Sequence, residues 1–504
     1  MFLLLFAVLI CPTYAQDAAA WPGPTFSEFS GVNQGSPDGP LAGSALGWDR
    51  PDIGWSEVEP TQGDWRSDVL DKWGKSVLAY QAAGMHEIIT LGYNTGWSYD
   101  HSGSTYEYGN RRWVMRPRSD GKFDYASYTK QPDNSWKQDG SGEVISGNSD
   151  FPLAKEHIQD WENYVRRVVT FFHKPPYNVE YFQIWNEAHP DSGFWNGNLD
   201  DYITRVHLPA AAIIHELGAK VVYGGWPCCA PLEEYTALLD KHQAWSSVDV
   251  FDVHYFPVSA YDYLRKAAIQ RGIRNPSIWQ SELGFTTDPT YISNTYPRIL
   301  SWGLASGWTK PNQYKAFYFA NWSPDDPKAF GYGSCLMSGS KLSAHGQSLQ
   351  TLASLLGGGV LKLQPGVSSM PALKAETDER LSSMEAFRIG NRAVVAIHLS
   401  ENNSAKIMVD PNGGHDMIYL GPGSHESIQV HLPFARSAIE AIERVDITGL
   451  RTDLAASAFA SGDSQTQVSV PARDTSGSDA YSWQGEDGGV AAHVRTFYVA
   501  VTLK

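Results

Sequence analysis

The chain has few cysteines, comparatively few basic residues and no long hydrophobic run in its interior. Only 4 cysteines occur among 504 residues, so the fold must rely on a buried core rather than on a disulfide framework. Beyond the N-terminus, no stretch approaches the roughly 20 apolar residues of a transmembrane helix. The 39 lysines and arginines are outnumbered by 55 aspartates and glutamates, which gives a net charge of −16. This acidity argues against a nucleic-acid partner.

The N-terminus is the one strongly apolar segment. Residues 2–10 are hydrophobic and precede two small residues, Thr13 and Ala15, at the −3 and −1 positions of a possible cleavage site. This pattern predicts a secretory signal peptide over residues 1–15 that is too short to span a bilayer. A lipoprotein anchor at Cys11 is disfavoured by the large residue before it. We therefore expect a secreted or periplasmic protein without a membrane span.

Three cysteines remain after that cleavage, namely Cys228, Cys229 and Cys335. The adjacent pair could bond to each other, one of them could reach Cys335, or all three could be free thiols. Neither these cysteines nor the histidines and acids show the spacing of a metal site. We expect no metal and no cofactor.

Strand-like and helix-like patterns alternate between residues 26 and 356. The expected strands are residues 29–33, 44–49, 87–91, 181–185, 220–224, 248–255, 277–282 and 314–320. Eight such repeats predict an α/β protein with a (β/α)₈ TIM barrel, a fold that runs from about 200 to over 400 residues. An open doubly wound sheet is the alternative, and the lack of a Gly-rich phosphate turn disfavours it.

Helical spacing of apolar residues appears between these strands. One expected helix places Leu70, Trp73 and Val77 on a single face. The others cover residues 158–172, 201–217, 232–242, 261–271, 296–305 and 343–356. Pro209 predicts a kink in the second of these.

Two segments depart from the alternation. Residues 99–150 are rich in Gly, Ser, Asn and Tyr without clear periodicity, which predicts a long, ordered, functional loop. Three consecutive glycines at 357–359 mark a boundary, after which short alternating runs predict an antiparallel β-sandwich over residues 357–504. The expected strands there are residues 384–389, 393–399, 406–409, 427–432 and 496–503. This second domain could bind carbohydrate or simply cover the barrel, and we favour the second role.

The expected strand ends carry polar and aromatic residues. An apolar strand ends on Asn186 and Glu187, and a second ends on Glu282. In a TIM barrel the C-terminal strand ends converge on one bowl, where active sites lie. The other residues expected at this bowl are Arg50, Asn94, Trp97, His254, Tyr255 and Trp322. Two acids among amides and aromatic rings suit a neutral, polyhydroxylated substrate, and two carboxylates are the minimum for cleaving a glycosidic bond.

Two motifs carry a resemblance to a known group. With Trp185-Asn186-Glu187 on the fourth strand and Ser281-Glu282-Leu283-Gly284 on the seventh, the barrel resembles clan A glycoside hydrolases. Within the clan it is most similar to family 39, on the strength of Gly193-Phe194-Trp195, the helix that carries Trp161 and the trailing sandwich. One departure is Ala188, where that family usually has Pro after the acid.

The resemblance implies a retaining double displacement and assigns roles by position. Glu187 would be the general acid/base and Glu282 the nucleophile. Asn186 would bind the sugar 2-hydroxyl, and Tyr255 would keep the nucleophile ionised. The remaining roles are positive potential from Arg50, substrate contacts from His254 and Trp195, and a ring under the sugar from Trp322. The two carboxyl carbons would lie about 5–5.5 Å apart.

Bland alternatives stay open for several of these residues. His254 could be a core histidine, Arg50 could pair only with a neighbouring aspartate, and Trp97 and Trp195 could be core aromatics. The favoured function is an exo-acting, β-xylosidase-like hydrolase of oligosaccharides or polysaccharides, because a long aromatic loop after the third strand could wall off one side of the bowl. The alternatives are an endo-acting β-glucanase or mannanase and a non-catalytic carbohydrate-binding protein.

Overall fold

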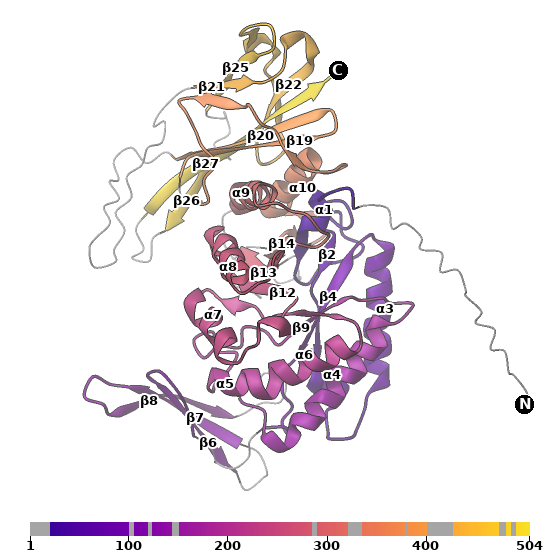
Figure 1. Cartoon of the computed structure of the whole chain (residues 1–504), viewed down its shortest axis with the longest axis vertical. Coiled ribbons are helices and arrows are strands. Elements are labelled where there is room, and N and C mark those ends of the chain that lie inside the picture. The colour runs from indigo at the N-terminus through magenta and orange to yellow at the C-terminus, as the bar shows by residue number, and fades with distance from the viewer. Residues whose placement is uncertain are drawn as a thin grey trace, which may run out of the picture.

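Eight parallel strands close into a barrel in the computed structural model of the chain (Figure 1). The structure describes residues 21–99, 105–118, 123–143, 151–284, 290–320, 335–379, 381–400, 427–472, 480–484 and 490–504. The barrel strands are β1 (Ser30–Val32), β2 (Trp48–Asp49), β4 (His86–Gly92), β9 (Tyr181–Ile184), β10 (Lys220–Val222), β12 (Val250–His254), β13 (Ser277–Gly284) and β14 (Tyr314–Phe319). Pairing of β10 with β12 closes the ring, so the predicted TIM barrel is confirmed.

Alternation along the strands fills the barrel interior in layers. The lower layer is apolar and aromatic, and is made by Trp48, Ile88, Tyr181, Val222, Val250, Trp279 and Phe317. Two residues further along β9, Gln183 points the same way and is fully buried. The interior therefore changes from apolar to polar toward the C-terminal strand ends.

Helices cover the outside of the barrel. They are α3 (Ser67–Ala82), α4 (Ile158–His173), α6 (Leu208–Glu216), α7 (Leu232–Lys241), α8 (Ser259–Gln270), α9 (Tyr291–Ala305) and α10 (Ala344–Leu356). Short elements add α1 (Phe26–Phe29), α2 (Trp55–Val58), α5 (Leu199–Asp201), β3 (Asp52–Gly54), β11 (Trp226–Pro227) and the hairpin β15 (Met337–Ser338) with β16 (Lys341–Leu342). In the described part of the chain, no helix is both long and apolar enough to cross a membrane.

Two connections differ from the predicted alternation. Between β1 and β2, residues 33–47 form turns and contain no helix. The helix expected to kink at Pro209 instead has a π-helical segment, Tyr202–His207, immediately before α6. Because proline lacks an N–H, it cannot continue the α-helical hydrogen-bond ladder, and the wider π-turn accommodates the break.

The segment expected to be a long loop forms a four-stranded antiparallel sheet. Its strands are β5 (Thr105–Tyr108), β6 (Arg111–Pro117), β7 (Phe123–Lys130) and β8 (Trp136–Glu143). Figure 1 shows this sheet projecting from one side of the barrel. Its inner face forms a small cluster around Tyr106, Trp113 and Met115, which packs with Tyr99 and Phe151. The prediction of a loop was therefore wrong for the described residues of this segment, although the expectation that it is ordered agrees with the sheet.

Antiparallel sheets follow α10. One contains β17 (Lys362–Leu363), β19 (Ser383–Ile389), β20 (Arg392–Ser400), β22 (Ile439–Val445), β23 (Arg451–Asp453), β26 (Ala480–Gln484) and β27 (Val490–Leu503). The other contains β18 (Ser368–Met370), β21 (Ser427–Leu432), β24 (Ala458–Ala460) and β25 (Thr466–Pro471). The expected strand at 406–409 lies outside the described residues.

The larger of these sheets packs with both of its faces. On β20, Val395 and Ile397 join the core between the two sheets, whereas Val394 and Ala396 join the core of the barrel. From α9 the buried Arg298 donates to backbone carbonyls in the segment before β19, those of Glu376, Asp378 and Leu381. Apolar contact and these hydrogen bonds fix the sheets against the barrel.

Candidate active site

The two predicted carboxylates meet at the C-terminal end of the barrel. Glu187 lies just beyond β9 and Glu282 lies within β13, and both are buried. One carboxylate oxygen of Glu187 lies within 4.8 Å of one of Glu282. The two acids are almost a hundred residues apart in the chain, and β10 and β12 separate their strands in the barrel, yet both side chains belong to one small cluster.

His254 lies between the two acids. Its Nδ1 is 2.8 Å from Oε1 of Glu187 and 3.8 Å from Oε1 of Glu282. Its Nε2 is 2.9 Å from the hydroxyl of Ser281 and 3.5 Å from Asp252. Burial alone lowers the pKa of His254, but the charge of Glu282 and the bonds to Asp252 and Glu187 outweigh burial and raise it to about 10. The imidazole is therefore a cation at neutral pH, and the core-histidine alternative does not account for these contacts.

Arg50 is the second cation of the cluster. Its Nη1 donates to Oε1 of Glu282 at 2.8 Å, and its Nη2 donates to Oδ1 of Asn186 at 2.6 Å. The same guanidinium donates to Asn33 and Gln183. Arg50 thus uses its planar fork to fix several site residues at once. The sequence left open that Arg50 pairs only with a neighbouring aspartate, and the structure shows the contacts above instead.

Tyr255 completes the surroundings of Glu282. Its hydroxyl donates to Oε2 at 2.7 Å. Burial raises the pKa of Glu282, whereas His254, Arg50 and the Tyr255 hydroxyl each lower it, and nearby Glu187 raises it again. Burial outweighs these three neighbours, so the pKa of Glu282 is raised overall, and His254, Arg50 and Tyr255 offset only part of the shift away from the ionised form that a nucleophile needs.

A buried network of hydrogen bonds between polar residues holds the cluster in place. Gln183 donates through Nε2 to Asp252 at 2.7 Å and accepts from Arg50, while the backbone N–H of Ser281 donates to Asp252 at 2.8 Å. Asn33 donates to the backbone carbonyl of Ser281 at 2.7 Å. Sequence reasoning assigned no role to Gln183. The available signal was a single amide in an otherwise apolar strand.

The backbone of the site adopts unusual conformations. Trp185, Glu187 and Tyr255 have φ of 68°, 44° and 57°. Left-handed conformations of this kind cost roughly 1–3 kcal/mol in non-glycine residues and concentrate at functional sites. Gly225 has φ of 69°, and a Cβ there would lie 2.1 Å from Nε2 of His254. A glycine is therefore needed for the imidazole to occupy its place.

Comparison with known proteins gives matches among solved structures. No family model matches the chain, and no curated protein matches it. A family 39 glycoside hydrolase from the gut symbiont Bacteroides cellulosilyticus WH2 is 13% identical, with 89% of this chain and 82% of that chain covered and a TM-score of 0.54. The two chains share their fold, a TIM barrel with a further domain of β-sheets.

Two further structures agree with this. The GH39 enzyme from Xanthomonas axonopodis pv. citri is 12% identical, with coverage of 97% and 96% and a TM-score of 0.52. A glucosidase from Croceicoccus marinus is 10% identical, with coverage of 96% and 98% and a TM-score of 0.50. At such identities the likeness establishes the fold alone, a TIM barrel.

Not all predicted binding residues reach the cluster. The structure brings Asn186, Arg50, His254 and Tyr255 together with the two acids. Asn94 is buried and donates to the carbonyl of Phe151, and Trp97 packs against Trp55 and His157. Trp195 is fully buried, and its indole N–H donates to the carbonyl of Asn198. Trp322 lies outside the described residues. The placements of Asn94, Trp97 and Trp195 correspond to packing roles rather than to substrate contact.

Two aromatic rings that the prediction passed over lie near the mouth of the site. Phe194, next to Trp195, is 37% exposed. Tyr93 stacks on Phe194 with ring centroids 6.2 Å apart and meets Trp185 edge-on. The chain turns after Glu187 so that Trp195 faces inward and Phe194 faces outward. Of the two rings in the motif Gly193-Phe194-Trp195, only that of Phe194 is exposed.

A cation could in principle use the same acids. Glu187, His254 and Glu282 offer one ligand atom each within 4.8 Å of one another. However, both ring nitrogens of His254 are engaged in hydrogen bonds, and the imidazole is protonated at neutral pH. The Arg50 guanidinium beside Glu282 would also repel a metal ion. The donor set fits an internal ion-pair network better than a metal centre.

The cysteines settle the alternatives left open by the sequence. Cys228, Cys229 and Cys335 are all free thiols. Cys228 and Cys229 follow β11 and are exposed. Although the Cys228 side chain is exposed, the protein around it removes part of its hydration, which raises the pKa of the thiol, and nearby Glu187 raises it further. The adjacent pair thus lies near the acid but is not activated as a nucleophile.

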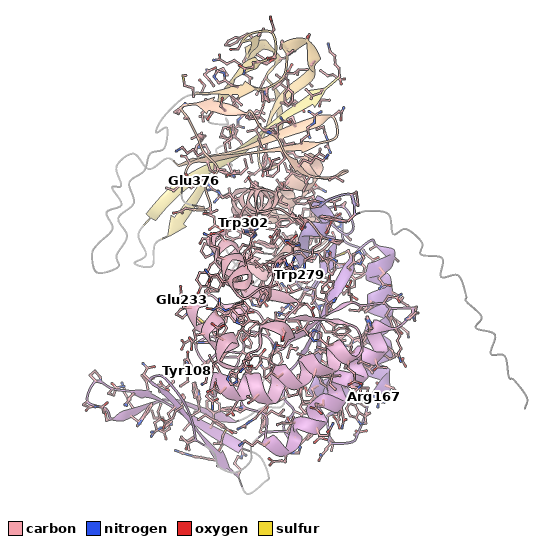
Figure 2. All side chains as sticks on the ribbon, viewed as in Figure 1. Tyr108, Arg167, Glu233, Trp279, Trp302 and Glu376 are labelled. Carbon is pink, nitrogen blue, oxygen red and sulfur yellow. The ribbon has the colours of Figure 1, made fainter. Side chains whose placement is uncertain are left out.

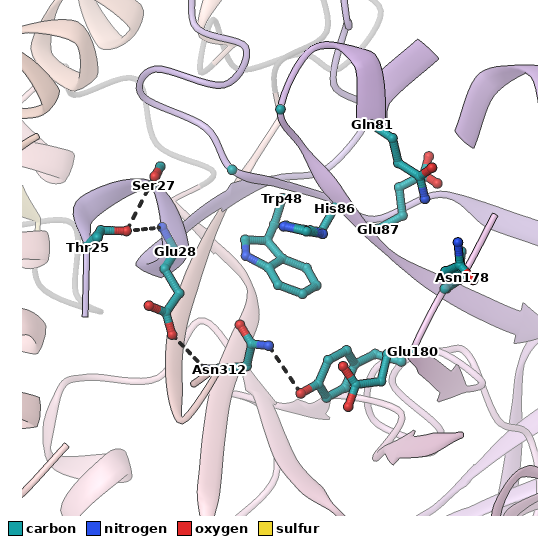
Figure 3. A pocket seen from close by; sticks show the side chains of 14 residues that line it. Thr25, Ser27, Glu28, Trp48, Gln81, His86, Glu87, Asn178, Glu180 and Asn312 are labelled. Carbon is teal, nitrogen blue, oxygen red and sulfur yellow. Dashed lines mark hydrogen bonds between the residues drawn. The ribbon is translucent and has the colours of Figure 1, made fainter. Parts of the chain in front are cut away.

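A cavity of about 370 Å³ opens at the other end of the barrel (Figure 3). Trp48, His86 and Tyr181 line it at the beginnings of their strands. Asn312 and Glu28 also line it and are bonded to each other. Active sites of this fold lie at the opposite strand ends, where the acids are, so this cavity is separate from the candidate site.

Proposed function

We propose that the protein is a retaining glycoside hydrolase that uses Glu187 and Glu282. The observation that carries the proposal is the placement of both carboxylates at strand ends of a glycoside hydrolase fold, with oxygens within 4.8 Å of each other. Retaining enzymes hold their carboxyl groups about 5–5.5 Å apart, whereas inverting enzymes leave about 6.5–9.5 Å for a water molecule.

Glu282 acts as the nucleophile in the first step. A carboxylate oxygen attacks the anomeric carbon while the bond to the leaving oxygen breaks, and Glu187 gives its proton to that oxygen. Arg50 and Tyr255, which both donate to Glu282, stabilise the carboxylate before attack. The Asn186 side chain, held by Arg50, is oriented to bind the sugar 2-hydroxyl.

Water completes the second step. Glu187, now a carboxylate, takes a proton from water as the water oxygen attacks the anomeric carbon and the ester to Glu282 breaks. His254, whose Nδ1 lies 2.8 Å from Oε1 of Glu187, offers this carboxylate a hydrogen bond at this stage.

The proposed substrate is a β-linked oligosaccharide from whose chain end single pentose-sized sugars are removed. Support comes from the β5–β8 sheet, whose Tyr108 hydroxyl lies 3.1 Å from Nε2 of His189 in the loop after Glu187, so that the sheet can limit the bowl on that side. Trp322 is the proposed ring under the sugar. We also propose export, with removal of residues 1–15, and N-terminal sequencing of protein recovered from the medium or periplasm tests it.

A panel of nitrophenyl glycosides tests the activity directly. We expect hydrolysis of a β-pentoside, and loss of nearly all turnover in Glu282→Gln, while Glu57→Gln serves as an exposed-acid control. On a xylo-oligosaccharide, monosaccharide from the first minutes supports the exo proposal, and a ladder of mid-length products contradicts it. Sugar binding without hydrolysis of any substrate would indicate the non-catalytic alternative.

A further inference from the structure

Three elements meet at Tyr108, at the end of β5, where the projecting sheet reaches the barrel (Figure 2). The Tyr108 hydroxyl donates to Glu234 in the first turn of α7 and lies 3.1 Å from Nε2 of His189. His189 Nε2 is in turn 3.4 Å from Glu234. We call these three residues the latch. It joins the sheet, the loop after β9 and α7.

The protonation of the latch follows from its contacts. The backbone N–H of Asp191 donates to Nδ1 of His189 at 3.0 Å, so the ring proton sits on Nε2 and faces Glu234 and Tyr108. Burial lowers the pKa of His189 and outweighs the charge of Glu234, which raises it. The ring is therefore neutral. Both latch donors thus have an acceptor, and His189 is fully buried.

The loop that the latch holds makes hydrogen bonds to the backbone of Glu187, the proposed acid. The N–H of His189 and the hydroxyl of Ser192 both donate to the carbonyl of Glu187, each at 2.6 Å. Glu187 itself has φ of 44°, a left-handed conformation that the surroundings must enforce. From the sheet, Arg111 also donates to the carbonyl of Pro190 at 2.6 Å. The loop from Glu187 onward is therefore held from the side of β5 and β6.

We propose that Tyr108 is a positioning residue for acid catalysis: through His189 it holds the Glu187 loop, so that the β5–β8 sheet is coupled to proton donation. This inference rests on the proposed function. It differs from a merely structural role, because a loose latch would impair only the step that needs a well-placed proton. A leaving group that departs as a stable anion needs no such proton.

The experiment compares Tyr108→Phe with the natural enzyme on two glycosides of the same sugar. A dinitrophenyl leaving group requires no protonation, whereas an alkyl or sugar leaving group does. In Tyr108→Phe we expect kcat/KM for the alkyl or sugar glycoside to fall roughly ten-fold, and kcat/KM for the dinitrophenyl glycoside to stay nearly unchanged. A ten-fold loss is a modest part of the ~10²–10⁴-fold rate increase that a positioned general acid supplies. Glu234→Ala should behave alike, and Glu234→Gln, which keeps an acceptor, should recover most of the loss.

Tyr128→Phe is the matched control, because the Tyr128 hydroxyl accepts only from Arg116 within the same sheet among the hydrogen bonds of the described residues. It should leave both substrates unaffected. An equal fall for both leaving groups in Tyr108→Phe, or no change for either, would overturn the latch while the proposed function stands. If the natural enzyme hydrolyses neither glycoside, the proposed function fails and the latch with it.

Discussion

Arg50 donates from Nη1 to Oε1 of Glu282 across 2.8 Å, and the two side chains are only 3% and 9% exposed. A buried pair of this kind cannot lose one partner without leaving the other charge uncompensated, which costs about 3–5 kcal/mol. The guanidinium also holds Asn186 and Gln183. The cluster is therefore a single electrostatic unit rather than a set of independent contacts.

Replacing Arg50 with lysine tests this unit. Arg50→Lys keeps the positive charge but cannot reproduce the planar fork. We expect kcat/KM to fall roughly 100-fold, because misplacement of a catalytic group by about 1 Å costs on that order. Arg66→Lys, at an exposed pair with Asp68, is the control and should be silent. Near-normal turnover in Arg50→Lys would show that charge alone suffices.

Glu87 predicts a pH dependence of stability. Both of its carboxylate oxygens are buried without a hydrogen-bond partner in the described part of the chain. Burial and the neighbouring Asp49 raise the pKa of Glu87 from 4.5 to about 8. Since the folded state holds this proton more tightly than the unfolded state, the stabilisation is fully present below pH 4.5 and is lost as pH rises through about 8.

Denaturant unfolding at several pH values checks this. Glu87→Gln should flatten the decline in unfolding free energy between about pH 4.5 and 8 and be more stable than the natural protein at the upper end. The exposed Glu180→Gln is the control. A decline of unchanged steepness in Glu87→Gln would assign the pH dependence to other groups.

Gly225 predicts a steric effect on the site. A Cβ at Gly225 would lie 2.1 Å from Nε2 of His254, so Gly225→Ala must displace the imidazole. Gly272→Ala is a matched control, because Gly272 also has positive φ but nothing lies within 4 Å of the added carbon. Both variants should lose similar backbone stability, on the order of 1 kcal/mol, whereas only Gly225→Ala should lose most of the turnover. Equal turnover in the two variants would contradict the placement of His254.

Arg298 predicts how firmly the C-terminal sheets are attached. Its buried guanidinium donates to three carbonyls ahead of β19. In Arg298→Met the carbonyls of Glu376 and Leu381 lose this donor, whereas that of Asp378 keeps the backbone N–H of Leu381. At about 1–3 kcal/mol for each lost partner, we expect a loss of roughly 2 kcal/mol or more in unfolding free energy. Arg166→Met, on the exposed surface, is the control. A loss below ~1 kcal/mol would mean that apolar contacts alone hold the sheets.

The barrel was predictable because its strands are buried on both faces. Strand β9, for example, is a continuous buried run, and such runs stand out from the helical patterns between them. The β5–β8 sheet was missed for the opposite reason. Only one of its faces packs, and Arg112, Tyr128 and Trp136 on the other face obscure the alternation. A small sheet with one polar face and frequent turns resembles a loop in composition.

The site residues also divide into those whose positions the sequence predicts and those whose positions it does not. Glu187, Glu282 and Arg50 sit at or next to barrel strands, so the position in the chain predicts the position in the bowl. Whether Phe194 or Trp195 is exposed depends instead on how the chain turns after Glu187. The left-handed conformation of Glu187 cannot be read from residue types. That turn buries Trp195 and exposes Phe194. The support from Gln183 depends on which strand neighbours face inward, a property of the closed barrel.

Rescue by azide of the two alanine variants tests the central claim most directly. In Glu282→Ala, azide replaces the missing nucleophile and should convert a β-glycoside with an activated leaving group into the α-glycosyl azide, since one displacement inverts the carbon. In Glu187→Ala, azide attacks the glycosyl intermediate on Glu282 and should give the β-glycosyl azide. Proton NMR of the products distinguishes the anomers. We expect the α-glycosyl azide from Glu282→Ala and the β-glycosyl azide from Glu187→Ala. The reverse assignment, or the same anomer from both variants, would contradict the proposed roles of the two acids.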